Sequence, residues 1–311
     1  MLKKMEKNRL VFSTECVPFV RVAERANLSV VARELGVGQS TVTRHLNELE
    51  EAVGVALLSR TTRRVTLTEE GSRYYTNCLQ ILRLVEQAAE EARDARQAPA
   101  GAVRLSCTAA LGVMHVTRMI FAFQDRHPDI RIDLNLTDER IDLVREGVDV
   151  ALRLGPLADS SMKLHAVGES QRLLVGAPAY LSARGRPERP ADLSRYETVV
   201  MSNVAGSNQL LLSAPDGTSL TIPVSGRLRV DHGLAARAAL AAGRGIGPTH
   251  LWLVHDLLDD GRLEVVLGDY QPFPVPVSLL IVPERAAIAR VRLLVDFLAA
   301  EIAKLPGIRP S

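Results

Sequence analysis

Five polar side chains recur in one stretch of the chain at the spacing of a single helix face. They are Gln39, Ser40, Thr43, Arg44 and Asn47. The set combines short hydrogen-bonding groups with one guanidinium, and such groups read base edges and phosphates in the major groove of DNA. A merely solvated helix face has the same residue types, so both interpretations stay open on these residues alone.

Three arginines follow closely, at the tip of a predicted hairpin. Residues 56–59 and 65–67 have the character of two short strands, and between them lie Arg60, Thr61, Thr62, Arg63 and Arg64. An arginine-rich tip beside a polar helix can grip phosphate and reach into a minor groove. The two stretches together therefore predict a wing that assists a DNA-reading helix.

Two helices joined by a tight turn would position the polar face. Ser29 is a favoured N-cap residue and predicts a first helix that ends at Gly36, since glycine adopts the left-handed C-cap conformation without strain. The second helix is predicted from Gln39 to Gly54. Its inner side carries an apolar stripe of Val42, Leu46, Leu49 and Val53. A preceding helix is expected from about Val17 to Ala26, with Phe19, Val20 and Ala23 inward and Pro18 in its first turn.

A long helix is predicted after the wing. Thr68 can cap it, and the chain continues without proline to about Gln97. Apolar residues recur along it at alternating steps of three and four, which indicates a heptad seam that needs a partner helix. The residues expected at this dimer seam are Tyr75, Cys78, Leu82, Val85 and Ala89, with Ala92 continuing the stripe. The alternative is a core helix that packs on its own domain.

The stretch ARELGVGQSTVTRHLNELEEAVGVALLSRTTRRVTLTEEG resembles the N-terminal signature of the LysR-type transcriptional regulators. The resemblance covers nearly the whole chain, and its first seventy or so residues are the most specific part. It implies a winged helix-turn-helix, a long linker helix and a two-lobed effector domain. The expected DNA contacts are Ser29, Gln39, Ser40, Thr41, Thr43, Arg44, Arg60, Thr61, Thr62, Arg63 and Arg64. Gly38 departs from the family, which commonly has a serine N-cap there.

From Ala102 onward, predicted strands and helices alternate, among them a strand over residues 130–136 and a helix over residues 139–146, and this favours an α/β domain with largely parallel sheets. The layout resembles the type II periplasmic-binding fold of the LysR effector domain. We expect the chain to divide into a winged helix-turn-helix domain (1–67), a linker helix (68–97), a hinge (98–101) and an effector-binding domain (102–306). Lobe I would take residues 102–172 and 275–306, and lobe II residues 173–274. The glycine-rich run 243–250 replaces an apolar run usual in the family, so its strand could differ.

A ring of loop positions is expected to hold a small molecule. Ligands of open α/β sheets bind beyond the carboxyl ends of strands, at helix N-termini. That rule selects Thr108, Ala109, Ala110, Thr137, Arg153, Leu154, Gly155, Ser202, Asn203 and His232. Hydroxyls, helix dipoles and Arg153 would suit a small anion such as a carboxylate. Arg153 could equally pair with Asp149 or Asp138, and His232 could be an ordinary exposed loop histidine.

Composition sets limits on other functions. The net charge is only +2, so any affinity for DNA must come from local placement of basic residues. The cysteines Cys16, Cys78 and Cys107 show no metal-ligand spacing, and Cys107 has no neighbouring cysteine in sequence to resolve an oxidised form. No HExxH, GxSxG or nucleotide-binding glycine motif is present. We therefore expect no cofactor, no metal and no catalytic residues.

The leading hypothesis is a sequence-specific transcription factor whose small-molecule effector changes the geometry of a homodimer or homotetramer on promoter DNA. RNA polymerase is an expected partner and the membrane is not. With no export signal and no apolar run long enough to span a bilayer, a cytoplasmic location is expected. Two alternatives remain: a solute-binding protein or enzyme built on the two-lobed domain, and an architectural DNA binder without an effector.

Overall fold

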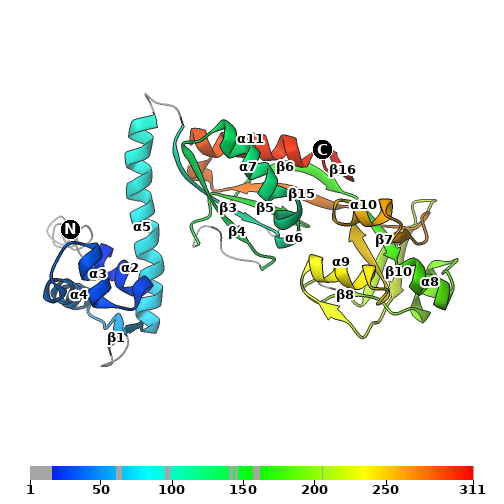
Figure 1. Ribbon diagram of the computed structural model, residues 1–311, viewed down its shortest axis with the longest axis horizontal. Helices are drawn as coiled ribbons and strands as arrows, with labels where there is room; N and C mark the ends of the chain where they lie inside the picture. The colour runs from blue at the N-terminus through cyan, green and yellow to red at the C-terminus, as the bar shows by residue number, and fades with distance from the viewer. Residues whose placement is uncertain are drawn as a thin grey trace. The chain divides into compact units, whose positions relative to one another are not determined.

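The computed structural model describes residues 16–60, 65–94, 99–139, 143, 146–156, 162–204 and 206–310 (Figure 1). The chain forms two compact units, one made mainly of residues 1–95 and the other mainly of residues 96–311. The first contains the helix-turn-helix, the wing and the long helix. The second contains both lobes of the α/β domain.

The N-terminal unit is a winged helix-turn-helix. Its elements are α2 (Cys16–Arg25), α3 (Leu28–Glu34), α4 (Gln39–Val53), β1 (Leu58–Arg60) and β2 (Val65–Leu67), and the two strands pair antiparallel. Phe19, Val31, Val42, Leu46 and Leu49 are at most 1% exposed and form its apolar core. The apolar stripe on α4 is therefore buried as predicted through Leu49, and it turns the polar side of the helix outward.

Three details of this winged helix-turn-helix, called the head below, differ from the prediction. Ser29 is not the N-cap of α3; Asn27 holds that position, and its Oδ1 accepts from the Ser29 and Val30 amides at 3.0 and 3.2 Å. Val53 is 38% exposed, because it is the last residue of α4 before Gly54 turns into the left-handed region. In α2, Val22 is fully buried while Ala23 is only half-buried.

The long helix α5 (Glu69–Asp94) begins directly after Thr68, whose Oγ1 accepts from the Gly71 amide at 2.9 Å. The prediction that Cys78 lies in a dimer seam is wrong. Its side chain is 1% exposed and packs against Cys16 of α2, so it belongs to the core of its own chain. Val85, in contrast, is 63% exposed. The side chain of Ala89 lies outside the described residues.

Lobe I is built on a six-stranded sheet in the order β16-β6-β15-β5-β3-β4. These strands are β3 (Gly101–Cys107), β4 (Ile130–Leu136), β5 (Val150–Leu154), β6 (Lys163–Ser170), β15 (Val275–Ile281) and β16 (Ile308–Pro310). Its helices are α6 (Ala109–Leu111), the π-helical turn η1 (Gly112–Val116), α7 (Thr117–Arg126), the short 3-10 helix η3 (Pro283–Arg285) and α11 (Ala289–Ile302). Most of the helix predicted over residues 139–146 lies outside the described residues.

Lobe II contains three small sheets, ordered β12-β7-β13, β10-β9-β14 and β11-β8. The strands are β7 (Arg172–Gly176), β8 (Val200–Met201), β9 (Gln209–Ser213), β10 (Ser219–Pro223), β11 (Arg229–Val230), β12 (Ile246–His250), β13 (Glu264–Val265) and β14 (Gln271–Pro272). The helices are α8 (Pro178–Arg184), the 3-10 helix η2 (Pro190–Arg195), α9 (Gly233–Ala241) and α10 (Leu251–Asp259).

The prediction of largely parallel sheets is wrong. Among the described strands, only the pairs β3–β4, β3–β5 and β8–β11 are parallel. The strand β15 returns from lobe II and inserts between β5 and β6, running antiparallel to both. Alternation of strands and helices along the sequence does not reveal such a late insertion, since its partners lie more than a hundred residues away.

The glycine-rich run still forms the regular strand β12, which pairs with β7. A Cβ on Gly245 would lie 2.3 Å from the carbonyl oxygen of Glu197, so the backbone approaches too closely for any side chain. The departure from the apolar pattern is therefore explained by close backbone packing, and the strand itself is kept.

Candidate nucleic-acid interface and effector pocket

The outward face of α4 presents the predicted DNA-reading residues to solvent. Gln39, Ser40, Arg44 and Asn47 are exposed, while Thr41 and Thr43 are half-buried. The Arg44 guanidinium lies 3.8 Å from the Glu48 carboxylate, a solvent-exposed pair that a phosphate can replace at little cost. The face is thus available for hydrogen bonding to a ligand.

The N-terminus of this helix has no side-chain cap. Gly38 occupies the N-cap position with extended backbone angles, and it supplies no side-chain acceptor. In its neighbourhood, the Ser29 hydroxyl donates to Gln39 Oε1 at 2.9 Å and so links α3 to the first residue of α4. Ser29 was expected among the DNA contacts. In this structure its side chain contacts Gln39, another of the expected DNA contacts.

Glu50 joins the C-terminal end of α4 to the start of the wing. Its Oε1 accepts from the backbone amides of Leu57 and Leu58, at 2.7 and 2.9 Å. Thr68 completes the clamp, because its hydroxyl donates to the Ala56 carbonyl at 2.8 Å. The contact made by Glu50 could not be predicted from the sequence, since a glutamate on a helix is usually solvated and nothing in its local pattern predicts a contact with the following strand.

The tip of the wing lies largely outside the described residues. Arg60 ends β1 opposite Val65 in the hairpin register. Thr61, Thr62, Arg63 and Arg64 belong to the part that is not described. Their role on DNA stays a prediction.

Two thiols meet in the core of the head. The sulfurs of Cys16 and Cys78 lie 3.5 Å apart, and the Tyr74 hydroxyl is 3.9 Å from the Cys16 sulfur. The hydrogen bond to Cys16, together with burial, raises the pKa of the Cys78 thiol far above its usual range. The Cys78 thiol is therefore a neutral packing group at physiological pH.

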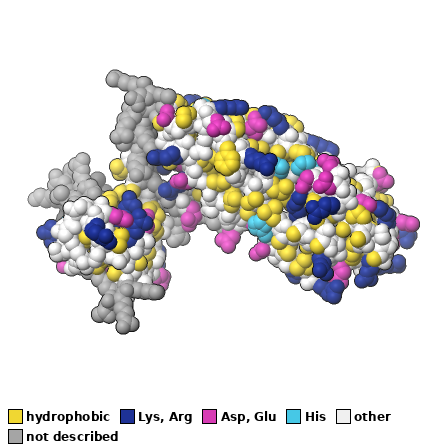
Figure 2. Space-filling model, in the orientation of Figure 1, with side chains coloured by type: hydrophobic (Ala, Val, Ile, Leu, Met, Phe, Trp, Pro, Cys, Tyr) yellow, Lys and Arg dark blue, Asp and Glu magenta, His cyan; other side chains and the backbone are white. Residues whose placement is uncertain are grey.

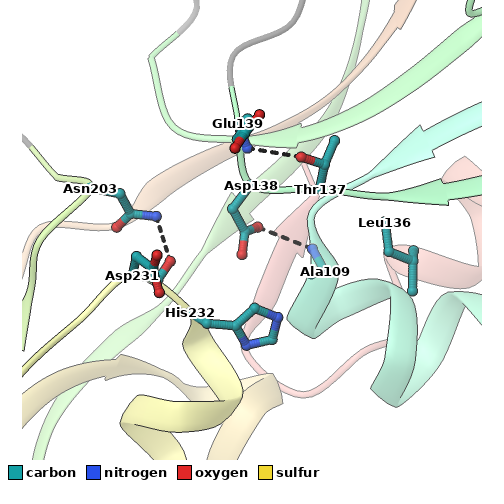
Figure 3. Close-up of a pocket in the computed structure, with 8 residues that line it drawn as sticks. All are labelled: Ala109, Leu136, Thr137, Asp138, Glu139, Asn203, Asp231 and His232. Carbon is teal, nitrogen blue, oxygen red and sulfur yellow. Dashed lines mark hydrogen bonds between the residues drawn. The ribbon is translucent and has the colours of Figure 1, made fainter.

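A cavity of about 680 Å³ opens between the two lobes (Figure 3). It lies beyond the carboxyl ends of strands from both lobes, as expected for this class of sheet. Its described lining consists of Ala109, Leu136, Thr137, Asp138, Glu139, Asn203, Asp231 and His232. Of the ten predicted effector residues, the structure brings four together here: Ala109, Thr137, Asn203 and His232.

Backbone hydrogen bonds orient the polar groups of this pocket. Asp138 Oδ1 accepts from the Ala109 amide at 3.0 Å, and His232 Nδ1 accepts from the Leu234 amide at 3.2 Å. Because Nδ1 is an acceptor, a neutral His232 carries its proton on Nε2. Asn203 Nδ2 donates to the Asp231 carbonyl at 2.7 Å. Figure 3 shows the Asp138 carboxylate and the His232 ring extending from opposite lobes toward the same space.

The two lobes lie in close contact beside this pocket. Gly233, the first residue of α9, faces Ala110 of α6, and a Cβ on Gly233 would lie only 2.9 Å from the Ala110 Cβ. Glycine at this position therefore allows α9 to reach the first lobe.

Arg153 is not part of the described lining. Its Nη2 donates to Ser106 Oγ at 2.8 Å, and burial lowers its pKa. The alternative that it pairs with Asp149 is wrong, since Asp149 lies 3.2 Å from the Arg285 guanidinium instead. Asp138, the other expected partner, accepts a hydrogen bond from the Ala109 amide.

The remaining predicted effector residues are not part of the described lining of the pocket. Thr108 has a buried hydroxyl with no hydrogen-bond partner among the described residues. The Gly155 amide donates to the Pro276 carbonyl, and the Ser202 amide to the Val230 carbonyl. Ala110 is buried at 6% exposure, and Leu154 is half-buried at the end of β5.

Cys107 ends β3 and is fully buried. Burial raises its pKa to about 12, so the thiol stays protonated at physiological pH. Among the described residues, no group of three or more His, Cys, Asp or Glu side chains could hold a metal ion. No helix in the described part of the chain is long and apolar enough to cross a membrane.

Acidic and basic side chains alternate over the face of the α/β unit that Figure 2 shows. No single sign of charge dominates that face. That face therefore offers no uniformly basic surface for DNA.

Comparison with known proteins gives matches over both units. The model of the bacterial regulatory helix-turn-helix protein, lysR family, matches residues 16–72, and the LysR substrate binding domain matches residues 96–303. The Escherichia coli regulator DmlR is 32% identical over 291 residues, which cover 94% of each chain. The E. coli activator AaeR is 30% identical, covering 92% of this chain and 94% of its own.

Solved structures of full-length regulators have the same fold. The Vibrio cholerae virulence activator AphB, a member of the LTTR protein family, is 28% identical with a TM-score of 0.64, and the match covers 92% of this chain and 98% of AphB. CrgA from Neisseria meningitidis, a LysR-type transcriptional regulator, is 27% identical with a TM-score of 0.61, covering 94% and 99%.

Proposed function

The chain belongs to the LysR family of bacterial transcriptional regulators, and from this premise we propose how its own residues bind DNA and an effector. It combines a helix-turn-helix DNA-binding domain with an effector-binding domain, and the predicted winged and two-lobed fold is confirmed. The residue roles below are proposals supported by the geometry of the two units.

We propose that Gln39, Ser40 and Thr43 read base edges, with Thr41 and Ser29 beside them. Arg44 and the wing residues Arg60 to Arg64 would hold the phosphate backbone. The observation that carries this proposal is the burial of Val42, Leu46 and Leu49 on the apolar side of α4, which leaves its polar side exposed beside the wing. A recognition helix in a major groove needs this division of faces.

We also propose that α5 pairs with its counterpart in a second copy. The exposed Val85 and the half-buried Leu82 and Tyr75 support a seam on this helix. A two-fold dimer would place two recognition helices on half-sites about one DNA turn, or a multiple of it, apart. The division into residues 1–67, 68–97, 98–101 and 102–306 stays part of this proposal.

The effector is proposed to bind in the cavity between the lobes. Thr137, Asn203 and His232 offer donors, while Asp138, Glu139 and Asp231 offer acceptors. A small carboxylate remains the first class to test, and the acidic part of the lining favours one that also carries hydroxyl or amino groups. Binding can switch the regulator only if it favours one arrangement of the oligomer over another.

RNA polymerase as a partner and a cytoplasmic location follow from a role at promoters and are proposed on that ground. The characterised relatives are transcriptional regulators, and we propose that this chain has no catalytic activity. A solute-binding protein would have no use for the matched DNA-binding head.

Selection of bound fragments from a random DNA pool, with and without candidate carboxylates, tests the function. We expect an enriched palindrome-like site whose affinity or footprint changes with one of the ligands. If the purified protein showed no preference among duplexes at moderate salt with any ligand, the proposal would be contradicted.

The wing is tested through the salt dependence of binding. Arg63→Ala should weaken binding to all sequences and reduce the slope of log K against log salt by about 1, since one phosphate contact is lost. Gln39→Ala is the matched control and should leave the slope unchanged. Equal slopes for Arg63→Ala and the parent would remove the wing from the interface.

A further inference from the structure

Two exposed side chains on different helices of the head are joined by one hydrogen bond. The Ser29 hydroxyl on α3 donates to Gln39 Oε1 on α4, with a distance of 2.9 Å between the oxygens. The residues are separated by ten positions and by the turn at Gly36, whose φ of +66° reverses the chain. The contact therefore depends on the helix-turn-helix geometry and is absent from either helix alone.

Local hydrogen bonds fix the backbone at both residues of this contact. Asn27 Oδ1 accepts from the Ser29 and Val30 amides and fixes the first turn of α3. Gln39 is the first residue of α4, where the Thr41 and Val42 amides donate to the Gly38 carbonyl. Ser29 therefore presents its hydroxyl from a defined position to a side chain that starts from a defined position.

The bond decides which end of the Gln39 amide faces outward. Because Oε1 is turned toward Ser29, Nε2 with its two N–H donors is turned away from α3. In the major groove such a donor is complementary to guanine O6 and N7 or thymine O4, which are acceptors. A freely rotating glutamine could present either end and would lose side-chain entropy on binding.

We propose that Ser29 is a positioning residue that holds Gln39 as a hydrogen-bond donor for one base of each half-site. The proposal rests on the function proposed above, in which α4 enters the major groove. Ser29 then sharpens sequence preference without touching the DNA itself.

Selected-site binding by four variants tests the arrangement. Ser29→Ala should lower discrimination at one base position about three- to tenfold, the range expected when one side chain is no longer held in place. Gln39→Ala should relax the same position, and the double variant should be no worse than Gln39→Ala. Ser29→Thr keeps the hydroxyl and should restore the preference. Ser72→Ala, on α5, is the control for loss of a serine hydroxyl elsewhere.

The polarity of the amide has its own test. Gln39→Glu keeps an acceptor for Ser29 but presents no donor to DNA. Discrimination at the position should then be lost or shifted toward cytosine, which offers a donor. Retention of the parental preference by Gln39→Glu would show that Gln39 reads through its oxygen, and would overturn the proposal.

The remaining outcomes separate this inference from the function it rests on. If Gln39→Ala relaxes a position while Ser29→Ala leaves it unchanged, the positioning role is wrong and the DNA-binding proposal stands. If the two losses add fully in the double variant, Ser29 contacts DNA by itself and the positioning role is again wrong. A parent protein without sequence preference would overturn the function and the inference together. Thermal unfolding of each variant establishes that the head stays folded.

Discussion

Glu50 joins the DNA-reading helix to the wing through two backbone amides. An anionic acceptor makes these bonds stronger than neutral ones, and removing it leaves two amides to find other partners. We expect Glu50→Ala to lower the free energy of unfolding of the head by about 2 kcal/mol. It should also weaken DNA binding, because the wing is no longer fixed to α4.

Urea denaturation and the salt slope of DNA binding measure the two effects of Glu50→Ala. Glu51→Ala is the matched control, since Glu51 is exposed on the same helix. An unchanged unfolding midpoint for Glu50→Ala would show that solvent replaces these bonds without loss.

Some of these residue-level features can be predicted from the sequence, and others depend on the fold. The exposed face of α4 could be predicted because apolar side chains repeat on its other side at helical spacing. The contacts of Glu50 and the Ser29–Gln39 bond could not, because each depends on which backbone or side chain lies opposite in space. The Asn27 cap is local and could have been predicted, since asparagine is a favoured N-cap residue. Arg153 was predicted in the cleft because it lies at the carboxyl end of a strand, and it instead donates to Ser106.

At the scale of elements, only part of the apolar stripe on α5 is buried within its own chain. Cys78 is buried in the head, whereas Val85 is 63% exposed one heptad further along. We expect Val85→Glu to dissociate the dimer, because a charge would be placed at an apolar contact between helices. Light scattering on size-separated protein gives the mass directly.

Asn77→Glu is the control for the seam. Asn77 is exposed and lies on the outer side of α5, away from the heptad stripe. The Asn77→Glu variant should stay a dimer. An unchanged mass for Val85→Glu would place the self-association surface elsewhere.

The helices α9 and α10 are joined by an ion pair. Arg237 donates to both carboxylate oxygens of Asp256, at 2.6 and 2.5 Å, and this hydrogen bonding lowers the pKa of Asp256 to about 2. A depressed pKa contributes stability above the unfolded value near 3.8, and that contribution is lost as the pH falls toward 2. Arg237→Met should therefore destabilise lobe II at pH 7, and the difference from the parent should shrink below pH 4.

Denaturant unfolding of parent and variant at pH 7, 5 and 3.5 follows this change. Arg262→Met is the comparison, because Arg262 is an exposed arginine close to the same helix end. A stability difference for Arg237→Met that stays constant across the series would assign the effect to packing of the arginine stem instead.

Most strands and helices of the effector domain could be predicted from the sequence, but the direction in which the strands pair could not. The range Ile130–Leu136 was predicted and is observed as β4, since alternation and turn residues mark its ends. The place of β15 between β5 and β6 depends on the chain's return from lobe II. Local patterns contain no information about such a distant partner, so the mixed sheet was missed.

At the scale of the effector domain, Gly233 and Ala110 form a tight contact between the lobes beside the pocket. Gly233→Ala would place two Cβ atoms 2.9 Å apart, and neither can move aside as a side-chain tip could. We expect the lobes to separate at the pocket and the affinity for the effector to fall at least tenfold, about 1.4 kcal/mol. Calorimetric titration with the ligand found in the screen measures this.

Restoring the space should restore the affinity. Ala110→Gly combined with Gly233→Ala exchanges the two side chains across the contact and should recover most of the binding. Gly268→Ala is the control, since its Cβ would lie 4.0 Å from Val265 in ordinary contact. Full effector affinity in Gly233→Ala alone would mean that the lobes do not need this approach.

The strand order of lobe I has a consequence for biosynthesis. The neighbours β5 and β6 are held apart by β15, which is translated more than a hundred residues after them. Until that segment leaves the ribosome, the central sheet has an open slot with unpaired edges, which are prone to pairing with other chains. The head is complete much earlier, so a nascent polypeptide holds a finished DNA-binding module while its sensor domain still lacks a central strand.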